Sequence, residues 1–156
     1  MKPSHKVFLL FVSLVLTCSV SGQEKKIKRS DLPPAVEKTV VEQSKGAMIR
    51  GFSEEKENGQ ATYEIEMVVN GHGKDVQMDA NGAVLEIEEQ VDLQAVSADV
   101  RAGLQAKAGK GKITKIESIR KKDKLVAYEA QVVTDGKKSE VQVGPDGKPL
   151  DHEGTD

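Results

Sequence analysis

Apolar residues recur every four positions at Leu32, Val36 and Val40, which is the spacing of one face of an α-helix. The prolines at 33–34 suit the first turn of such a helix, because the first helical positions need no backbone donor. Gly46 suits its end, because glycine tolerates the left-handed conformation that often terminates helices. The pattern therefore predicts a first helix that begins near residue 33 and ends before residue 46.

A second helix is predicted after Ser97, whose hydroxyl can accept a hydrogen bond from a free N–H in the first turn. Val100 and Leu104 continue the four-residue spacing, and Gly109 and Gly111 follow as a stop signal.

Most of the remaining chain alternates with a period of two. Tyr63, Ile65 and Met67 alternate with Glu64 and Glu66, which is typical of a strand with one buried and one wet face. The ranges 75–78 and 140–143 repeat this alternation. Asn-Gly and Asp-Gly pairs separate these segments and are strong hairpin signals, because both turn residues need a positive φ. They lie at 58–59, 70–71, 81–82, 135–136 and 146–147.

One stretch departs from this pattern. Ile113, Ile116 and Ile119 are three residues apart, which fits neither a regular strand nor a short helix. We expect a bulge or bend there. We also expect the two tyrosines, Tyr63 and Tyr128, to lie in the core, together with Leu85.

The pattern occurs twice. Residues 63–85 match residues 128–150 at a constant offset of 65, with eight of 23 positions identical, and the predicted helices match at an offset of 64. Recurrence at this period indicates repeated supersecondary units. The predicted fold class is α+β: two tandem units, 31–90 and 91–151, each a helix packed on an antiparallel sheet of three to four strands, with one shared sheet as a variant. We expect 23–30 to be a linker and 152–156 a polar tail.

The first 22 residues have the layout of a secretory signal peptide. Lys2 and Lys6 precede the apolar run 7–16, and small residues lead to a cleavage site after Gly22. This layout predicts a secreted or periplasmic protein. An uncleaved anchor, or a lipoprotein on Cys18, is the alternative.

Composition narrows the function further. The 156 residues carry a net charge of −2 with 3% aromatic residues, whereas nucleic-acid binding favours a basic surface with stacking aromatics. Removal of residues 1–22 also removes the single cysteine, so the mature chain has no disulfide.

The layout resembles the PepSY family and, within it, the secreted beta-lactamase-inhibitor-like, PepSY-like branch. The similar segments are the helix start LPPAVEKTV at 32–40, the Tyr-Glu strand starts at Tyr63 and Tyr128, and the endings VQMDANGAVL and VQVGPDGKPL. The resemblance covers nearly the whole mature chain as two copies. It implies helix-on-sheet units in an extracytoplasmic protein. It also implies a non-enzymatic binding role, in which the chain inhibits or escorts an extracytoplasmic enzyme such as a peptidase.

The residues themselves predict no chemistry. His72 lies beside a turn glycine, the other histidines are in the leader and the tail, and no cysteine remains to form a nucleophile or a zinc ligand. The acidic turns lack the ligand spacing of a calcium loop. We therefore expect no enzyme activity, no catalytic residue, no cofactor and no metal site.

Acidic residues on the wet face of the predicted strands are the candidate partner-binding residues. The set is Glu64, Glu66, Asp75, Glu86, Glu88, Glu129 and Glu140. An unknown protein partner with a basic surface would be complementary to this face, whereas nucleic acid and, after cleavage of the signal, membrane are not expected. A plain solvated face and an envelope sensor for a small ligand or cation are the alternatives.

Overall fold

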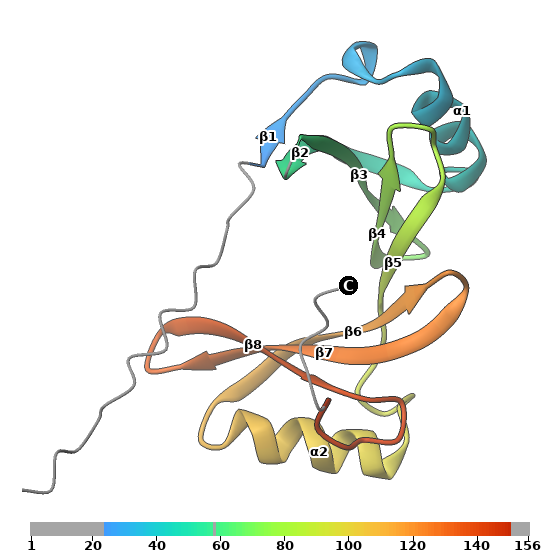
Figure 1. Cartoon of the computed structure of the whole chain (residues 1–156). Helices are drawn as coiled ribbons and strands as arrows, with labels where there is room; N and C mark the ends of the chain where they lie inside the picture. The colour runs from blue at the N-terminus through green and yellow to red at the C-terminus, as the bar shows by residue number, and fades with distance from the viewer. Residues whose placement is uncertain (1–23, 58, 151–156) are drawn as a thin grey trace, which may run out of the picture.

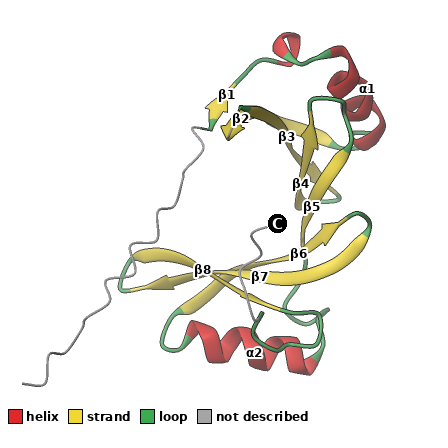
Figure 2. Cartoon of the chain, viewed as in Figure 1, coloured by secondary structure: helices red, strands yellow, loops and turns green. Residues whose placement is uncertain are grey.

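The described residues fold around one antiparallel sheet of eight strands, in which each strand pairs with its neighbours in chain order (Figure 1). The computed structural model describes residues 24–57 and 59–150. The predicted signal peptide, Asn58 of the first predicted turn, and the predicted tail lie outside the described residues. Figure 2 shows that strands dominate and that the α-helices lie on the same side of the sheet.

The strands are β1 (Lys25–Lys26), β2 (Met48–Glu57), β3 (Gln60–Val69), β4 (His72–Asp79), β5 (Val84–Gln90), β6 (Lys112–Lys121), β7 (Lys124–Thr134) and β8 (Lys137–Val143). The helices are α1 (Pro34–Gln43) and α2 (Ala98–Ala108), with a short 3-10 turn at Arg29–Asp31. Both helices begin and end where the sequence predicts, and Ser97 caps α2 by accepting a hydrogen bond from the Val100 N–H (3.2 Å).

The predicted architecture of two tandem helix-on-sheet units is wrong. Strand β5 pairs with β4 on one edge and with β6 on the other, from Glu86 opposite Lys121 to Gln90 opposite Glu117. The sheet is therefore continuous across the boundary expected at 90–91. The physical reason is that an unpaired edge leaves backbone donors and acceptors without partners, and pairing β5 with β6 satisfies both strands. The segment expected to be a linker, 23–30, contains β1, which pairs with β2.

Both helices lie on the outer side of the curved sheet, and its inner side carries no helix among the described residues (Figure 1). Val36 and Val40 of α1 are completely buried against β3 and β4, and Val100 and Leu104 of α2 are buried in a second cluster. Tyr63 belongs to the first cluster, as expected, and Tyr128 packs at the margin of the second. The buried residues of β3, β4, β7 and β8 in these clusters mark the helix-facing side of those strands.

Some local features follow the sequence signals and others do not. The register of β6 shifts between Ile113 and Lys115 and again after Ile119, which confirms the predicted bulge. The tight turn between β6 and β7 uses Lys122 and Asp123, both at positive φ, although no Asn-Gly or Asp-Gly pair marks it. The expectation that Leu85 is a core residue is wrong, because its side chain is exposed at the start of β5.

Candidate functional site

The inner face of the sheet is the candidate site, because strand alternation places the seven predicted acidic residues there. Residues that alternate with the buried positions of β3 and β4 point away from the helices. Glu64 and Glu66 lie on β3, Asp75 on β4, and Glu86 and Glu88 on β5. Glu129 and Glu140 lie on β7 and β8. All are half-buried except Glu140, which is exposed.

The structure brings several of these carboxylates into direct cross-strand pairs. Glu66 lies opposite Asp75, and Asp75 lies opposite Glu88, so three acidic residues form one row across β3, β4 and β5. Directly opposite like charges destabilise a sheet. Glu140 is the outlying member of the set, since it lies opposite Gln131 near the last strand.

Sequence reasoning missed one central residue, Glu117 on β6. Its side chain is 6% exposed, and it lies opposite Glu129, which makes a further acidic cross-strand pair. Its Oε2 accepts from the Lys115 ammonium at 2.7 Å. The three-residue isoleucine spacing hid the phase of β6, because the bulge between Ile113 and Lys115 interrupts the alternation. A strand assignment that allowed for the bulge would have placed Glu117 on the inner face.

Crowding shifts the protonation of this face toward the neutral form. Burial, followed by the charge of Asp75, raises the pKa of Glu64 to about 7. Burial, followed by the charge of Glu117, raises the pKa of Asp75 to about 6. Burial, a hydrogen bond with Glu86 and the charge of Glu129 raise the pKa of Glu88 to about 8. Near neutral pH the inner face therefore holds protons that ordinary carboxyls would have lost.

Few positive groups compensate these charges within the described ranges. Lys115 contacts Glu117, and the ammonium of Lys121 lies 3.1 Å from a carboxylate oxygen of Glu86. Burial, the largest single effect, lowers the pKa of Lys115, but the hydrogen bond to Glu117 and the charges of neighbouring acids together raise the pKa overall. The Gln142 amide donates to Glu129 at 2.6 Å. The row through Asp75 and the β3 acids has no such ion pair among the described residues.

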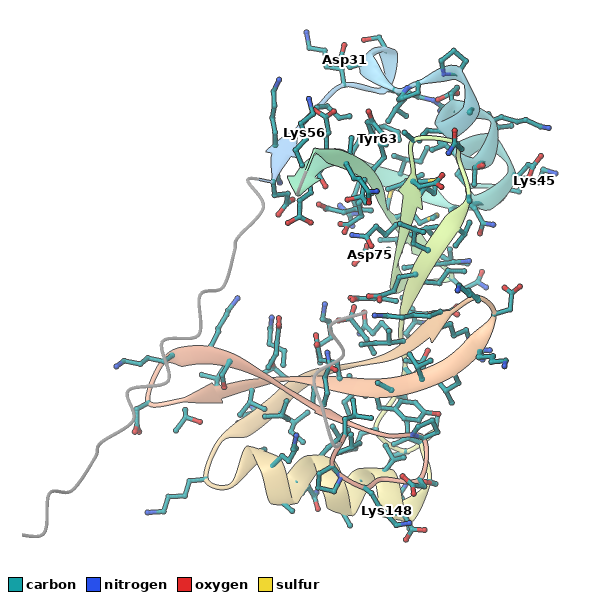
Figure 3. The ribbon with its side chains drawn as sticks, in the orientation of Figure 1. Asp31, Lys45, Lys56, Tyr63, Asp75 and Lys148 are labelled. Atoms are coloured by element: carbon teal, nitrogen blue, oxygen red, sulfur yellow. The ribbon has the colours of Figure 1, made fainter. Side chains whose placement is uncertain are left out.

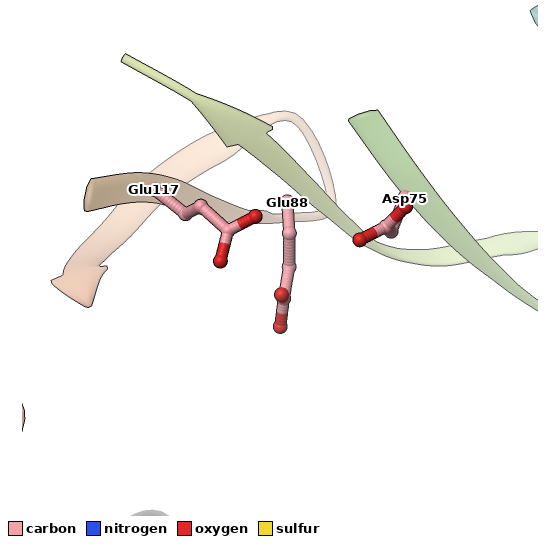
Figure 4. A group of neighbouring side chains, drawn as sticks. All are labelled: Asp75, Glu88 and Glu117. Carbon is pink, nitrogen blue, oxygen red and sulfur yellow. The ribbon is translucent and has the colours of Figure 1, made fainter. Parts of the chain in front are cut away.

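Three carboxylates meet where β4, β5 and β6 lie side by side. Asp75, Glu88 and Glu117 each offer an oxygen, and these oxygens all lie within 4.8 Å of one another (Figure 4). The residues come from three strands and are far apart in sequence, so spacing rules for metal loops could not find them. Figure 3 shows Asp75 on the inner side of the sheet, away from α1. Oxygen ligands of this kind suit hard cations such as Ca²⁺, although a calcium site takes six to eight of them.

No set of residues typical of nucleophilic catalysis appears in the part of the chain that the structure describes. His72 begins β4, and its Nε2 is 3.9 Å from a carboxylate oxygen of Asp92 at the surface. No helix within the described ranges is long and apolar enough to span a membrane.

Solved structures share the fold of this chain, whereas sequence comparisons find no match. No family model matches the sequence, and no curated protein matches it significantly. A candidate periplasmic protein from Bacteroides eggerthii superimposes with a TM-score of 0.61 at 17% identity, covering 76% of this chain and 86% of that chain. A DUF2874 family protein from Bacteroides ovatus gives 0.59 at 17% identity, covering 76% and 84%. A BLIP-like protein from Bacteroides fragilis gives 0.56 at 16% identity, covering 76% and 83%. The chain therefore shares its fold with DUF2874 and BLIP-like proteins.

Proposed function

We infer that the chain is a non-enzymatic binding module of the periplasm, and that its inner sheet face binds a basic segment of a protein partner. The observation that carries this proposal is the direct pairing of carboxylates across neighbouring strands: Glu66 with Asp75, Asp75 with Glu88, and Glu117 with Glu129. The rest of the inner face would provide the surface that contacts such a segment.

Folding alone gives little reason for these pairs. Each such pair, when both carboxylates are ionised, costs on the order of 0.2–1 kcal/mol of stability relative to a neutral pair. Burial is the largest cause of the raised pKa values of Glu64 and Glu88, and the charges of neighbouring acids raise them further. A basic partner would turn this repulsion into attraction, and it would also speed the encounter, because complementary charge steers association.

The periplasmic location rests on the sequence and on the fold. The predicted signal peptide directs export, and one protein that shares the fold is a candidate periplasmic protein. The mature chain should then have the mass of a polypeptide that begins at Gln23. The resemblance to PepSY-like proteins, together with the shared fold of the BLIP-like protein, supports an extracytoplasmic enzyme such as a peptidase as the partner that is inhibited or escorted.

Charge reversal on the inner face tests the proposal. The double variant Glu64→Lys with Glu66→Lys should keep the wild-type melting temperature or exceed it, because it removes repulsion. It should weaken capture of a partner from periplasmic extract, and binding of an oligolysine probe, by about ten-fold or more. Binding to the wild type should fall as salt rises.

The matched control reverses two exposed acids on the outer side, Glu42→Lys of α1 with Asp99→Lys of α2. It changes the net charge equally, so it should bind nearly as the wild type does. Equal loss of binding in both double variants would show that net charge, and not the inner face, governs association.

A second candidate function, an envelope cation sensor, is favoured by the three oxygens of Asp75, Glu88 and Glu117 within 4.8 Å. Titration with Ca²⁺ would separate the two. A sensor predicts saturable binding that Glu117→Gln abolishes, whereas the protein-binding function predicts only weak, salt-sensitive association of the ion.

A further inference from the structure

The two ends of the sheet differ from the strands between them. Among the described residues, β8 pairs only with β7, so the backbone groups on its other edge have no strand partner. Such an edge is a template for pairing with another extended segment. The chain itself shows what such an edge accepts, because β4 is the counterpart of β8.

The correspondence between β4 and β8 is fixed by their registers. Tyr63 lies opposite Met78, and 65 residues later Tyr128 lies opposite Val143. Each strand then turns beneath its own helix through a glycine at positive φ. A Cβ on Gly82 would meet the backbone of α1 at Ala35, and one on Gly147 would meet the backbone of α2 at Asp99.

The strands that flank each repeat also correspond, except beside β8. Lys25 of β1 lies opposite Glu54, and 64 residues later Glu89 of β5 lies opposite Ser118. Strand β1 therefore takes on β2 the place that β5 takes on β6. Strand β5 also covers the far edge of β4, with Ile87 opposite Val76. Within the described ranges, the equivalent place beside β8 holds no strand.

We propose that β8 is an acceptor edge for strand addition. The occupant is an extended segment of a protein partner that alternates apolar and basic residues and pairs antiparallel to β8 in the register that β5 takes on β4. The proposal extends the proposed function and relies on it for the charge of the partner.

The alternation follows from the two faces of β8. Val141 and Val143 lie on the helix side, where Val141 packs at the margin of the second core cluster and remains half-buried. An apolar residue opposite Val141 would cover it as Ile87 covers Val76. Glu140 and Gln142 lie on the inner face, beside Glu129. A basic residue opposite Glu140 would complement the acids there.

Residues 151–156 would be a poor occupant of this edge. Residues 151–156 read Asp-His-Glu-Gly-Thr-Asp, with no apolar residue to place opposite Val141. In the β5 register, Glu153 would lie opposite Glu140. A second copy added through its own β8 would place Glu140 against Glu140 if centred there. A separate partner avoids both like-charge contacts.

Binding of a defined peptide tests the proposal. The probe has the length of β5 and alternates valine and lysine. Two matched probes carry N-methyl groups on alternate residues, one series on each edge of the strand, so that composition and charge stay the same. Amide chemical shifts and hydrogen exchange of the chain from Gln23 report where each probe binds. We expect the β8 amides to gain protection, and one N-methylated series to bind about ten-fold more weakly than the other.

The alternatives give different results. Equal binding of both N-methylated probes, with shifts confined to β3–β5, would overturn strand addition and leave the proposed function intact. Glu140→Lys should weaken binding of the probe. If binding is lost only in the double variant Glu64→Lys with Glu66→Lys, strand addition at β8 is overturned as well.

Two further outcomes would assign the edge to other occupants and would also overturn the proposal. One is binding at least ten-fold tighter after truncation at Leu150, which would place residues 151–156 on the edge. The other is protection of β8 amides in a concentration-dependent dimer without peptide, measured by sedimentation.

Discussion

Asp75 on β4 and Glu88 on β5 lie directly opposite each other on the inner face of the sheet, and both have pKa values well above those of ordinary carboxyls. The pair sits next to Glu117, which is nearly buried. Such a contact is destabilising when both groups are ionised, and it becomes neutral or favourable when one carries a proton or when a cation approaches. We therefore expect the inner face to respond to pH, and a positive partner would relieve the same repulsion.

Stability should fall as the pH rises through the neutral range. For Glu64 and Glu88, the folded-state pKa values of about 7 and about 8 exceed the ordinary value of 4.5. Between these limits the folded chain binds more protons than the unfolded chain, so the free energy of unfolding decreases with pH. Urea midpoints measured from pH 5 to pH 9 should decline from the start of this range and should level off above about pH 8, as the two folded-state groups finish losing their protons.

The variant Glu88→Gln should flatten this profile, because it removes the group whose raised pKa is about 8. Glu42→Gln on the exposed side of α1 is the control and should leave the slope unchanged. A rise of the urea midpoint with pH in the wild type would contradict the assignment of these carboxyls to a crowded face.

The two turn glycines beneath the helices should be intolerant of any side chain. Gly82 has φ +78° and lies against the backbone of α1, where Thr39 Oγ1 donates to the Gly82 carbonyl at 2.7 Å. Gly82→Ala combines left-handed strain of about 1 kcal/mol with a clash against rigid backbone, so we expect a loss of more than about 2 kcal/mol. Gly46→Ala has a similar φ of +74° in open space and should cost about 1 kcal/mol. Chemical denaturation of both variants measures the difference, and equal losses would contradict the close docking of this turn.

Local signals in the sequence were sufficient for the elements themselves. The four-residue spacing at Val36 and Val40, the cap at Ser97 and the Asn-Gly and Asp-Gly turns each depend on neighbours a few residues away. The acidic face also followed from alternation along single strands. These features could be predicted because backbone geometry and side-chain direction are set within one turn or one strand.

The long-range features could not be predicted in the same way. Nothing near Glu86 in the sequence indicates that it will lie opposite Lys121, because β5 and β6 are separated along the chain by α2. The recurrence of the pattern suggested two units, with a shared sheet only as a variant, and it gave no indication that β5 would pair with β6. Glu117 was missed because a bulge shifts the phase of β6. The cluster of Asp75, Glu88 and Glu117 depends on both features, so it emerges only in three dimensions.

The two tyrosines should differ in their contribution to stability. Tyr63 is 8% exposed and its hydroxyl donates to Glu54 at 3.2 Å, whereas Tyr128 is only half-buried. Tyr63→Ala should cost on the order of 3 kcal/mol, and Tyr128→Ala should cost less. Tyr63→Phe should lose only about 1 kcal/mol, because it keeps the ring in the core and removes one hydrogen bond. Urea midpoints of the three variants provide the measurement, and an unchanged midpoint for Tyr63→Ala would show that the strand phase is wrong.

Folding should not require a metal ion, although three carboxylates gather on the inner face. Asp75, Glu88 and Glu117 supply three of the six to eight oxygens that Ca²⁺ takes, and the Lys115 ammonium already contacts Glu117. Because a structural metal contributes directly to the free energy of folding, its removal would lower the melting temperature by many degrees. We expect thermal melts with and without a chelator to coincide. A chelator-dependent drop that Glu117→Gln abolishes would instead establish this cluster as a structural metal site, and it would favour the cation sensor over the protein-binding module.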